Sequence, residues 1–168
     1  RAAEFGRLRA VVADSLSNAF GEASTPALYF SFRDRPSAVA ELHVRTRPGG
    51  EMDIAADVLS NGKTSRLYRA LVYETRLAAD VSALQASREM SSVFHISATA
   101  APGQSLAAIA EVVERTLDDL AATGPTTDEL ERATARAEAQ FVYRVQTIGG
   151  FGGKSDQLNA YNVFTGSP

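Results

Sequence analysis

Hydrophobic residues follow two different periods along this chain, and each period predicts a different kind of element. Alternation of apolar and polar residues predicts a strand around residues 28–33 and a second strand after the turn at residues 34–37. A hairpin is predicted between residues 79 and 100, with strands around 80–87 and 94–100. The residues expected to face inward on these strands are Leu28, Phe30, Phe32, Ala40, Leu42, Val44, Phe94, Ile96, Ala98 and Ala100. Their polar neighbours, which include Glu41, His43 and His95, are expected on the opposite faces.

Helical spacing marks the remaining segments, namely residues 4–20, 51–60, 65–74, 105–123, 126–145 and 155–164. Asn61 and Gly62 are expected to end the second of these, since both residues tolerate a left-handed backbone. Ser105 is a predicted N-cap, and Thr126 with Glu129 has the spacing of a capping box. The inward stripes are predicted to include Ile54, Val58, Leu59, Leu67, Leu71, Val72, Leu106, Ile109, Val113, Leu117, Leu120, Leu130, Ala133, Ala137, Phe141, Val145, Leu158 and Tyr161.

The order of these elements predicts an α+β fold. The strands come in adjacent pairs and are not separated singly by helices, which favours a mainly antiparallel sheet over a doubly wound parallel one. We expect the helices to pack on one face of that sheet.

Composition narrows the range of functions. The 168 residues contain no Cys, which removes disulfides and thiolate metal sites, and the net charge of −3 gives no broad basic surface for nucleic acid. No apolar run is long enough to span a membrane. The chain begins at Arg1, so we expect it to be a piece of a longer protein, and its compartment, bacterial periplasm or cytoplasm, stays open.

Two long motifs carry a resemblance to a known family. DVLSNGKTSRLYRALVYE at residues 57–74 and IGGFGGKSDQLNAYNVFTG at residues 148–166 resemble the second, non-catalytic half-domain of the M16 (pitrilysin/insulinase-type) zinc peptidases. The resemblance covers about residues 36–168 and implies one half-domain of the LuxS/MPP-like metallohydrolase fold across residues 1–168. Residues 1–35 match less well, and the helix at residues 4–20 is a candidate interdomain connector.

The resemblance also says where zinc chemistry should be absent. The catalytic half of the family carries His-x-x-Glu-His on the first helix after the strand pair, where two His on one helix face bind zinc. The corresponding residues 51–60 contain no His, and the chain has only His43 and His95. We therefore expect no catalytic residue, no metal and no cofactor in this chain, with zinc held by a separate catalytic half. If the strands of His43 and His95 pair, the two imidazoles approach each other, but the sequence indicates no further ligand.

Two further motifs have competing interpretations. Gly149, Gly150, Phe151, Gly152 and Gly153 form either a tightly turning connection or a segment that is a hinge or faces a peptide chamber. The Gly-Lys-Thr and Gly-Lys-Ser tripeptides at residues 62–64 and 153–155 lack the earlier Gly of a phosphate-binding loop and follow helices, so no nucleotide site is expected.

A third motif bears on peptide binding. Active members of the family use an Arg and a Tyr of the non-catalytic half to hold the peptide backbone, and the matching positions here are Val72 and Ala79.

The resemblance implies that this chain completes a clamshell chamber around a peptide together with a catalytic half. That half is either in the same chain or in a separate subunit, and self-association is the other expected partnership. The alternative is a structural or assembly module that has the fold but no role in proteolysis.

Overall fold

The structure is a computed structural model, and it describes residues 29–33, 38–46, 51–87, 92–149 and 151–167. The chain divides into two compact units, Arg1–Leu130 and Glu131–Pro168, which are considered separately below. The helix expected at residues 4–20, Leu28 of the first predicted strand, the turn at residues 34–37, the connection at residues 88–91 of the predicted hairpin, and Gly150 lie outside the described residues. No helix among the described ranges has the length and apolar character needed to cross a membrane.

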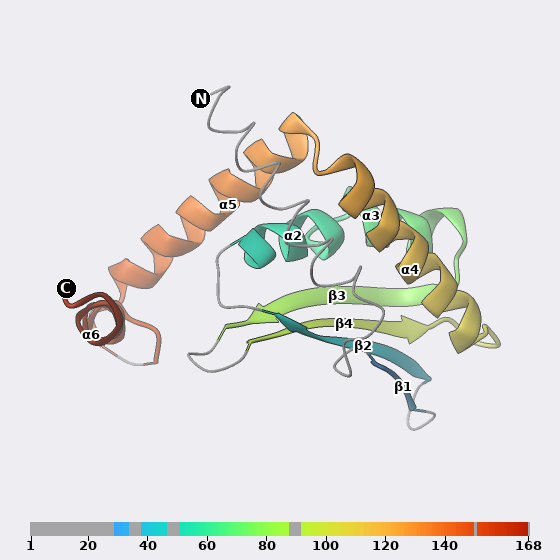
Figure 1. Ribbon diagram of the computed structural model, residues 1–168, viewed down its shortest axis with the longest axis horizontal. Coiled ribbons are helices and arrows are strands. Elements are labelled where there is room, and N and C mark those ends of the chain that lie inside the picture. Colours follow the sequence, from blue (N-terminus) through green and yellow to red (C-terminus); the bar gives the residue numbers. More distant parts are fainter. Residues whose placement is uncertain (1–28, 34–37, 47–50, 88–91, 150, 168) are drawn as a thin grey trace. The chain divides into compact units, whose positions relative to one another are not determined.

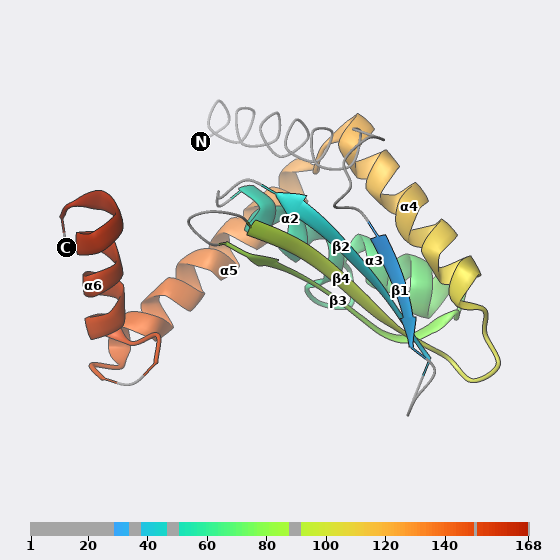
Figure 2. The same ribbon diagram turned by 60° about the horizontal axis from the view of Figure 1, so that its bottom comes forward.

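The first unit contains a four-stranded sheet. Its strands are β1 (Tyr29–Arg33), β2 (Val39–Thr46), β3 (Ala78–Ala86) and β4 (Ser92–Ala100). Their order is β1-β2-β4-β3, and every neighbouring pair is antiparallel (Figure 2). The predicted strands and the predicted antiparallel sheet are therefore confirmed.

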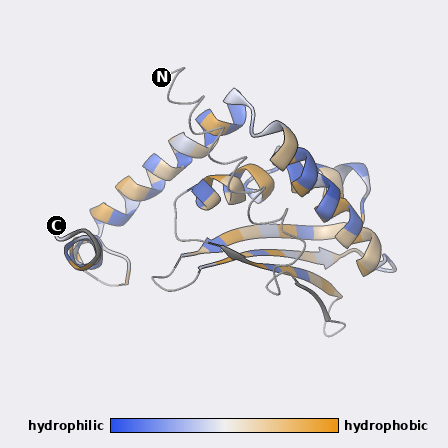
Figure 3. Ribbon diagram, viewed as in Figure 1, coloured by the Kyte–Doolittle hydropathy of each residue, from blue (hydrophilic) through white to orange (hydrophobic). Residues whose placement is uncertain are grey.

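Alternation along the two central strands separates the faces of this sheet, and hydrophobic and hydrophilic residues alternate along the ribbons in Figure 3. The side chains on the covered face are buried: Ala40, Leu42, Val44, Phe94, Ile96 and Ala98. Ala100, predicted inward with them, is only half-buried. The opposite face carries Glu41, His43 and His95, which are half-buried, and Leu84, which is 48% exposed.

The described helices that pack on the sheet lie on one of its faces (Figure 1). They are α2 (Glu51–Ser60), the single turn α3 (Arg66–Tyr68), the π-helix η1 (Arg69–Glu74) and α4 (Leu106–Thr123). Helix α2 packs on β3, and α4 packs on β2, β4 and η1. This arrangement is the α+β architecture predicted from the sequence.

The buried face of α2 differs from the predicted stripe. Val58 and Leu59 are buried as expected, but Ile54 is only half-buried, and Ala55 and Ala56 are buried instead. Small alanine side chains let the helix axis approach the sheet closely, so the contact face is centred on Ala55 and Leu59, which are four residues apart.

The segment after Ser65 also differs from expectation, because it is not one regular α-helix. After the single turn α3, the hydrogen bonds change to the i→i−5 pattern, and the backbone N–H of Thr75 donates to the carbonyl of Ala70 at 3.0 Å. Arg76 then turns the chain with a positive φ of 54°, which is unusual for a residue other than glycine. Leu67 and Leu71 are buried as predicted, whereas Val72 is half-buried.

The corner between α4 and α5 (Thr127–Gln146) is held by polar contacts. Gly124 ends α4 with φ 67°, and the capping box is present, since the Thr126 N–H donates to Glu129 at 2.8 Å and the Glu129 N–H donates to Thr126 Oγ1 at 3.3 Å. Arg66 donates to both carboxylate oxygens of Glu129 at 2.8 Å and to the Gly124 carbonyl at 3.1 Å. The predicted N-cap of α4 is also confirmed, because the Ser105 side chain accepts from the Ala108 N–H.

The second unit comprises the rest of α5 and α6 (Lys154–Thr165). Leu130 and Ala133 at the start of the predicted α5 stripe are buried, but the later Ala137 and Phe141 are exposed. The prediction that Leu158 and Tyr161 face inward on the last helix was wrong, because each is 42% exposed. Within the described part of this unit there are only these two helical segments.

Candidate functional site

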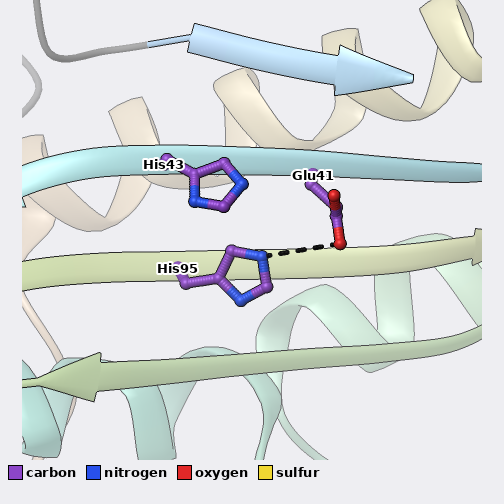
Figure 4. Close-up of side chains that lie close together, drawn as sticks. All are labelled: Glu41, His43 and His95. Carbon is purple, nitrogen blue, oxygen red and sulfur yellow. Dashed lines mark ion pairs between the residues drawn. The ribbon is translucent and has the colours of Figure 1, made fainter. Parts of the chain in front are cut away.

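Three side chains that can bind a metal lie together on the face of the sheet opposite the described helices. Glu41 and His43 are two residues apart on β2 and therefore lie on the same face, and His95 is the direct cross-strand neighbour of His43 on β4. Figure 4 shows the Glu41 carboxylate beside the ring of His95, with the His43 ring next to it. The central pairing of β2 with β4 is thus what brings these residues together.

The geometry of this cluster is close. The two imidazole ring centroids are 4.4 Å apart with an interplanar angle of 39°. The Nε2 atom of His95 lies 3.9 Å from Oε1 of Glu41, and one ligand atom from each of the three residues lies within 4.8 Å of the others. Each side chain is half-buried, so the group is set into the sheet surface without being sealed from it.

The electrostatic surroundings favour the neutral form of one histidine. Burial lowers the pKa of His95, the neighbouring charge of His43 lowers it further, and the Glu41 carboxylate only partly offsets these effects. The Nε2 atom of His95 is inaccessible to solvent and has no hydrogen-bond partner within the described part of the chain. A neutral imidazole with a free ring nitrogen is the form that binds metals.

The sequence predicted this arrangement in part. The prediction that His43 and His95 approach each other when their strands pair is confirmed. The third residue, Glu41, was missed as a ligand, although its two-residue spacing from His43 on a strand was the signal that places both on one face.

The helix that would carry the peptidase motif lacks its ligands. Helix α2 follows the strand pair β1 and β2 and contains no His. Its two aspartates that are four residues apart do not form a substitute, because Asp57 accepts a 2.6 Å hydrogen bond from Asn61 at the end of the helix and Asp53 is exposed.

The two positions that the resemblance assigns to peptide-backbone binding carry no hydrogen-bonding side chain in this chain. Val72 is half-buried in η1, and Ala79 lies at an irregularity in the pairing of β3 with β4. Nearby, Tyr73 is 51% exposed and packs edge-on against Tyr68, with ring centroids 5.4 Å apart. This contact does not indicate that Tyr73 binds the peptide backbone in their place.

The glycine-rich segment is a braced turn. The N–H of Lys154 donates to the Thr147 carbonyl at 2.7 Å, and the N–H of Gly152 donates to the Asp156 carboxylate at 2.8 Å. A Cβ atom at Gly153 would lie only 2.7 Å from the Thr147 carbonyl oxygen, so this position has no room for a side chain. These contacts support the tightly turning connection, while Phe151 at its tip is fully exposed.

The first phosphate-loop lookalike ends a helix. Gly62 adopts φ 90°, and Ser65 Oγ donates to the Gly62 carbonyl at 2.7 Å. A donated hydroxyl and a left-handed glycine are typical of a turn between helices, which agrees with the expectation of no nucleotide site.

Comparison with known proteins identifies a family. Residues 18–136 match the family described as the peptidase M16 inactive domain. A comparison with curated proteins gives no match.

Solved structures have the same fold. The inactive peptidase domain of a protein assigned as a zinc protease from Bordetella parapertussis is 22% identical, with a TM-score of 0.62 over 79% of this chain and 74% of that one. A protease from Helicobacter pylori is 24% identical, with a TM-score of 0.56 over 63% of this chain, and the match spans only 27% of the Helicobacter chain. The peptidase M16 inactive domain from Pseudomonas fluorescens is 16% identical, with a TM-score of 0.52 over 60% of this chain and 26% of that one.

Proposed function

The chain belongs to the family of M16 peptidase inactive domains, and from this membership we propose that it is the catalytically inactive half of a zinc metalloendopeptidase. In this proposal it completes a clamshell chamber around an unfolded peptide. The catalytic zinc is held by the His-x-x-Glu-His motif of a separate half, in the same chain or in another subunit.

One observation carries the proposal. A helix is present where the peptidase motif would lie, but it has none of the zinc ligands of that motif. Helix α2 follows the strand pair and packs on the sheet, but none of its ten residues is a histidine. A zinc site of this type needs two His on one helix face and a Glu that polarises the bound water. An intact scaffold without these groups supports a role in enclosing the peptide and not in cleaving it.

The glycine-rich segment has a place in this proposal. Residues 149–153 are a candidate hinge or chamber-facing segment, and the full exposure of Phe151 supports a contact with peptide or with the catalytic half. Val72 and Ala79 argue for weak backbone binding, because neither side chain can donate a hydrogen bond.

The alternative function is a structural or assembly module, which the same two positions favour. In that case the chain would pair with a catalytic half, or with itself, without contributing to hydrolysis. The presence of a His-x-x-Glu-His domain upstream in the same gene, or in an adjacent gene, would favour the peptidase function.

A reconstitution experiment separates these functions. The chain and the catalytic half encoded with it would be purified separately and mixed, and hydrolysis of a fluorogenic unfolded peptide would be measured. We expect no hydrolysis from this chain alone and strong hydrolysis only from the pair. Replacing the motif Glu of the catalytic half should abolish it.

Two results would contradict the proposal. Hydrolysis by this chain alone would place catalysis within it. Full activity of the catalytic half alone, unchanged when this chain is added and binds, would favour the structural module.

A further inference from the structure

We propose that Glu41, His43 and His95 form a binding site for a divalent transition-metal ion such as zinc, on the face of the sheet opposite the described helices. The proposal does not depend on the proposed function. The sequence alone indicated no third ligand, and the structure supplies one.

The ligand set has the chemistry of a zinc site. Two imidazole nitrogens and one carboxylate oxygen are common protein ligands of zinc, and three of them leave a fourth position for water or another donor. Imidazole ligands also select first-row transition ions over hard cations such as Mg²⁺, which prefer oxygen ligands and water.

The distances are near those that one ion requires. Ligand atoms bound to one zinc at about 2.0–2.1 Å in a tetrahedron lie roughly 3.3 Å apart. The three ligand atoms here lie within 4.8 Å of one another, and His95 Nε2 is 3.9 Å from Glu41 Oε1. Side-chain rotations that close these gaps by about 1 Å or somewhat more would bring the atoms to bonding distance without a change in the sheet.

The backbone that presents these side chains is fixed by the sheet. Strands β2 and β4 are the two central strands, with partners on both sides, and the register pairs His43 with His95 directly. Leu42, Val44 and Phe94, which are their neighbours along the two strands, are buried on the covered face. A metal site built on such a framework needs only side-chain adjustment, so little conformational entropy opposes binding.

One atom in the cluster indicates a missing partner. His95 Nε2 is buried and makes no hydrogen bond within the described ranges, and an unsatisfied buried polar group destabilises a folded protein. A bound cation beside this nitrogen would satisfy it. It would also neutralise the Glu41 carboxylate, which faces the same space (Figure 4).

The number of protein ligands indicates reversible binding. Structural zinc sites have four protein ligands and are closed, whereas this site has three on a sheet surface. We therefore expect zinc to bind when it is supplied and to be removed by a chelator. This behaviour is compatible with purification of the chain without zinc.

Calorimetric titration of the metal-free 168-residue chain with zinc chloride tests the site. We expect one zinc per chain, no detectable binding to His43→Asn or His95→Asn, and binding weakened roughly tenfold or more in Glu41→Gln. The chain contains only these two His, so both imidazole ¹⁵N signals in an NMR spectrum should shift on zinc addition. Glu111→Gln, an exposed carboxylate on α4, is the matched control and should bind like the parent.

The outcomes are decisive because folding is measured separately. Circular dichroism without metal should show that each variant is folded. If a histidine variant does not fold, the conservative variant Glu41→Gln still tests the site. Zinc should raise the Tm of the parent and of Glu111→Gln, while Mg²⁺ at the same concentration should not. Absence of zinc binding to the parent, or binding unchanged in folded Glu41→Gln or His95→Asn, would overturn the proposal.

Discussion

Helices α4 and α5 both carry hydrophobic stripes, but α4 buries its stripe from Ile109 to Leu120, whereas α5 buries only the start of its stripe. The α4 residues Ile109, Val113, Leu117 and Leu120 are all buried in the first unit. In α5 the stripe is buried at Leu130 and Ala133, and it is exposed at Ala137 and Phe141. Periodicity therefore predicts that a segment is an amphipathic helix, but it does not say what covers the apolar face.

The exposed part of this comparison is a set of apolar residues in the second unit. It consists of Phe141, Val142, Tyr143, Ile148, Phe151, Leu158, Tyr161 and Val163. Scattered exposed apolar residues are normal on a protein surface, but a concentration of them in 38 residues is typical of a surface that another element or partner covers. This agrees with the proposed pairing of this chain with a catalytic half.

The largest expected difference between the two regions is the effect of removing one leucine from each. Leu120→Ala on α4 should destabilise the chain by about 2–5 kcal/mol, because it removes a fully buried side chain and leaves a cavity. Leu158→Ala on α6 makes the same chemical change at a 42% exposed position and should change the free energy of unfolding by less than about 0.5 kcal/mol. Urea unfolding monitored by circular dichroism measures both.

Equal effects of the two substitutions would break the comparison. In particular, a loss of more than 2 kcal/mol in Leu158→Ala would show that α6 is covered in the isolated chain.

The fold was largely predictable because its signals are local. Alternation on β2 and β4 and helical spacing in α4 each arise from a single buried face, and they predicted the correct elements. Their predicted inward residues are buried except Ala100 and Leu106, which are half-buried. The π-helix after Tyr68 was not predictable, since a hydrogen-bond shift by one residue leaves almost no trace in the hydrophobic pattern. Burial of Leu158 was predicted wrongly because that prediction assumed a covering element.

The candidate metal site was only half predictable for a related reason. The hydrophobic pattern shows which face of a strand is polar, but it does not show which polar residues of two strands lie opposite each other. That depends on the strand register. The direct pairing of His43 with His95 fixes that register, and no local pattern in the sequence specifies it.

An intermediate loss of stability is expected from breaking the ion pair between Arg66 and Glu129, which lies in the first turn of α5. Glu129→Gln removes the charge that receives two hydrogen bonds from Arg66, and the two side chains are only 13% and 20% exposed. We expect destabilisation of about 1.5–2 kcal/mol at pH 7. Glu131→Gln, an exposed carboxylate in the next turn, is the control and should have almost no effect.

The same variant should change the dependence of stability on pH. Burial alone raises the pKa of Glu129, but hydrogen bonds from Arg66 and the Thr126 N–H, together with the Arg66 charge, lower it below its ordinary value of 4.5. A lowered carboxyl pKa stabilises the folded state fully above pH 4.5, and this contribution is lost as the pH falls through the folded-state pKa. The stability difference between parent and Glu129→Gln should therefore be constant from pH 7 to about pH 5.5 and shrink below pH 4.5. A difference that does not depend on pH would contradict this assignment.

A smaller loss of stability than that of Glu129→Gln is expected from removing the hydroxyl that caps α5. Thr126 Oγ1 accepts the Glu129 N–H at 3.3 Å, and this bond satisfies one of the donors that a helix start leaves without a partner. Thr126→Ala should destabilise the chain by about 1 kcal/mol, measured by the urea midpoint at unchanged slope. Thr127→Ala, one residue later and exposed, is the matched control, because its hydroxyl is inside the helix and is not needed as a cap. An unchanged midpoint in Thr126→Ala would mean that the carboxylate of Glu129, held by Arg66, caps the helix without the threonine hydroxyl, and α5 would then depend on the sheet unit for its start.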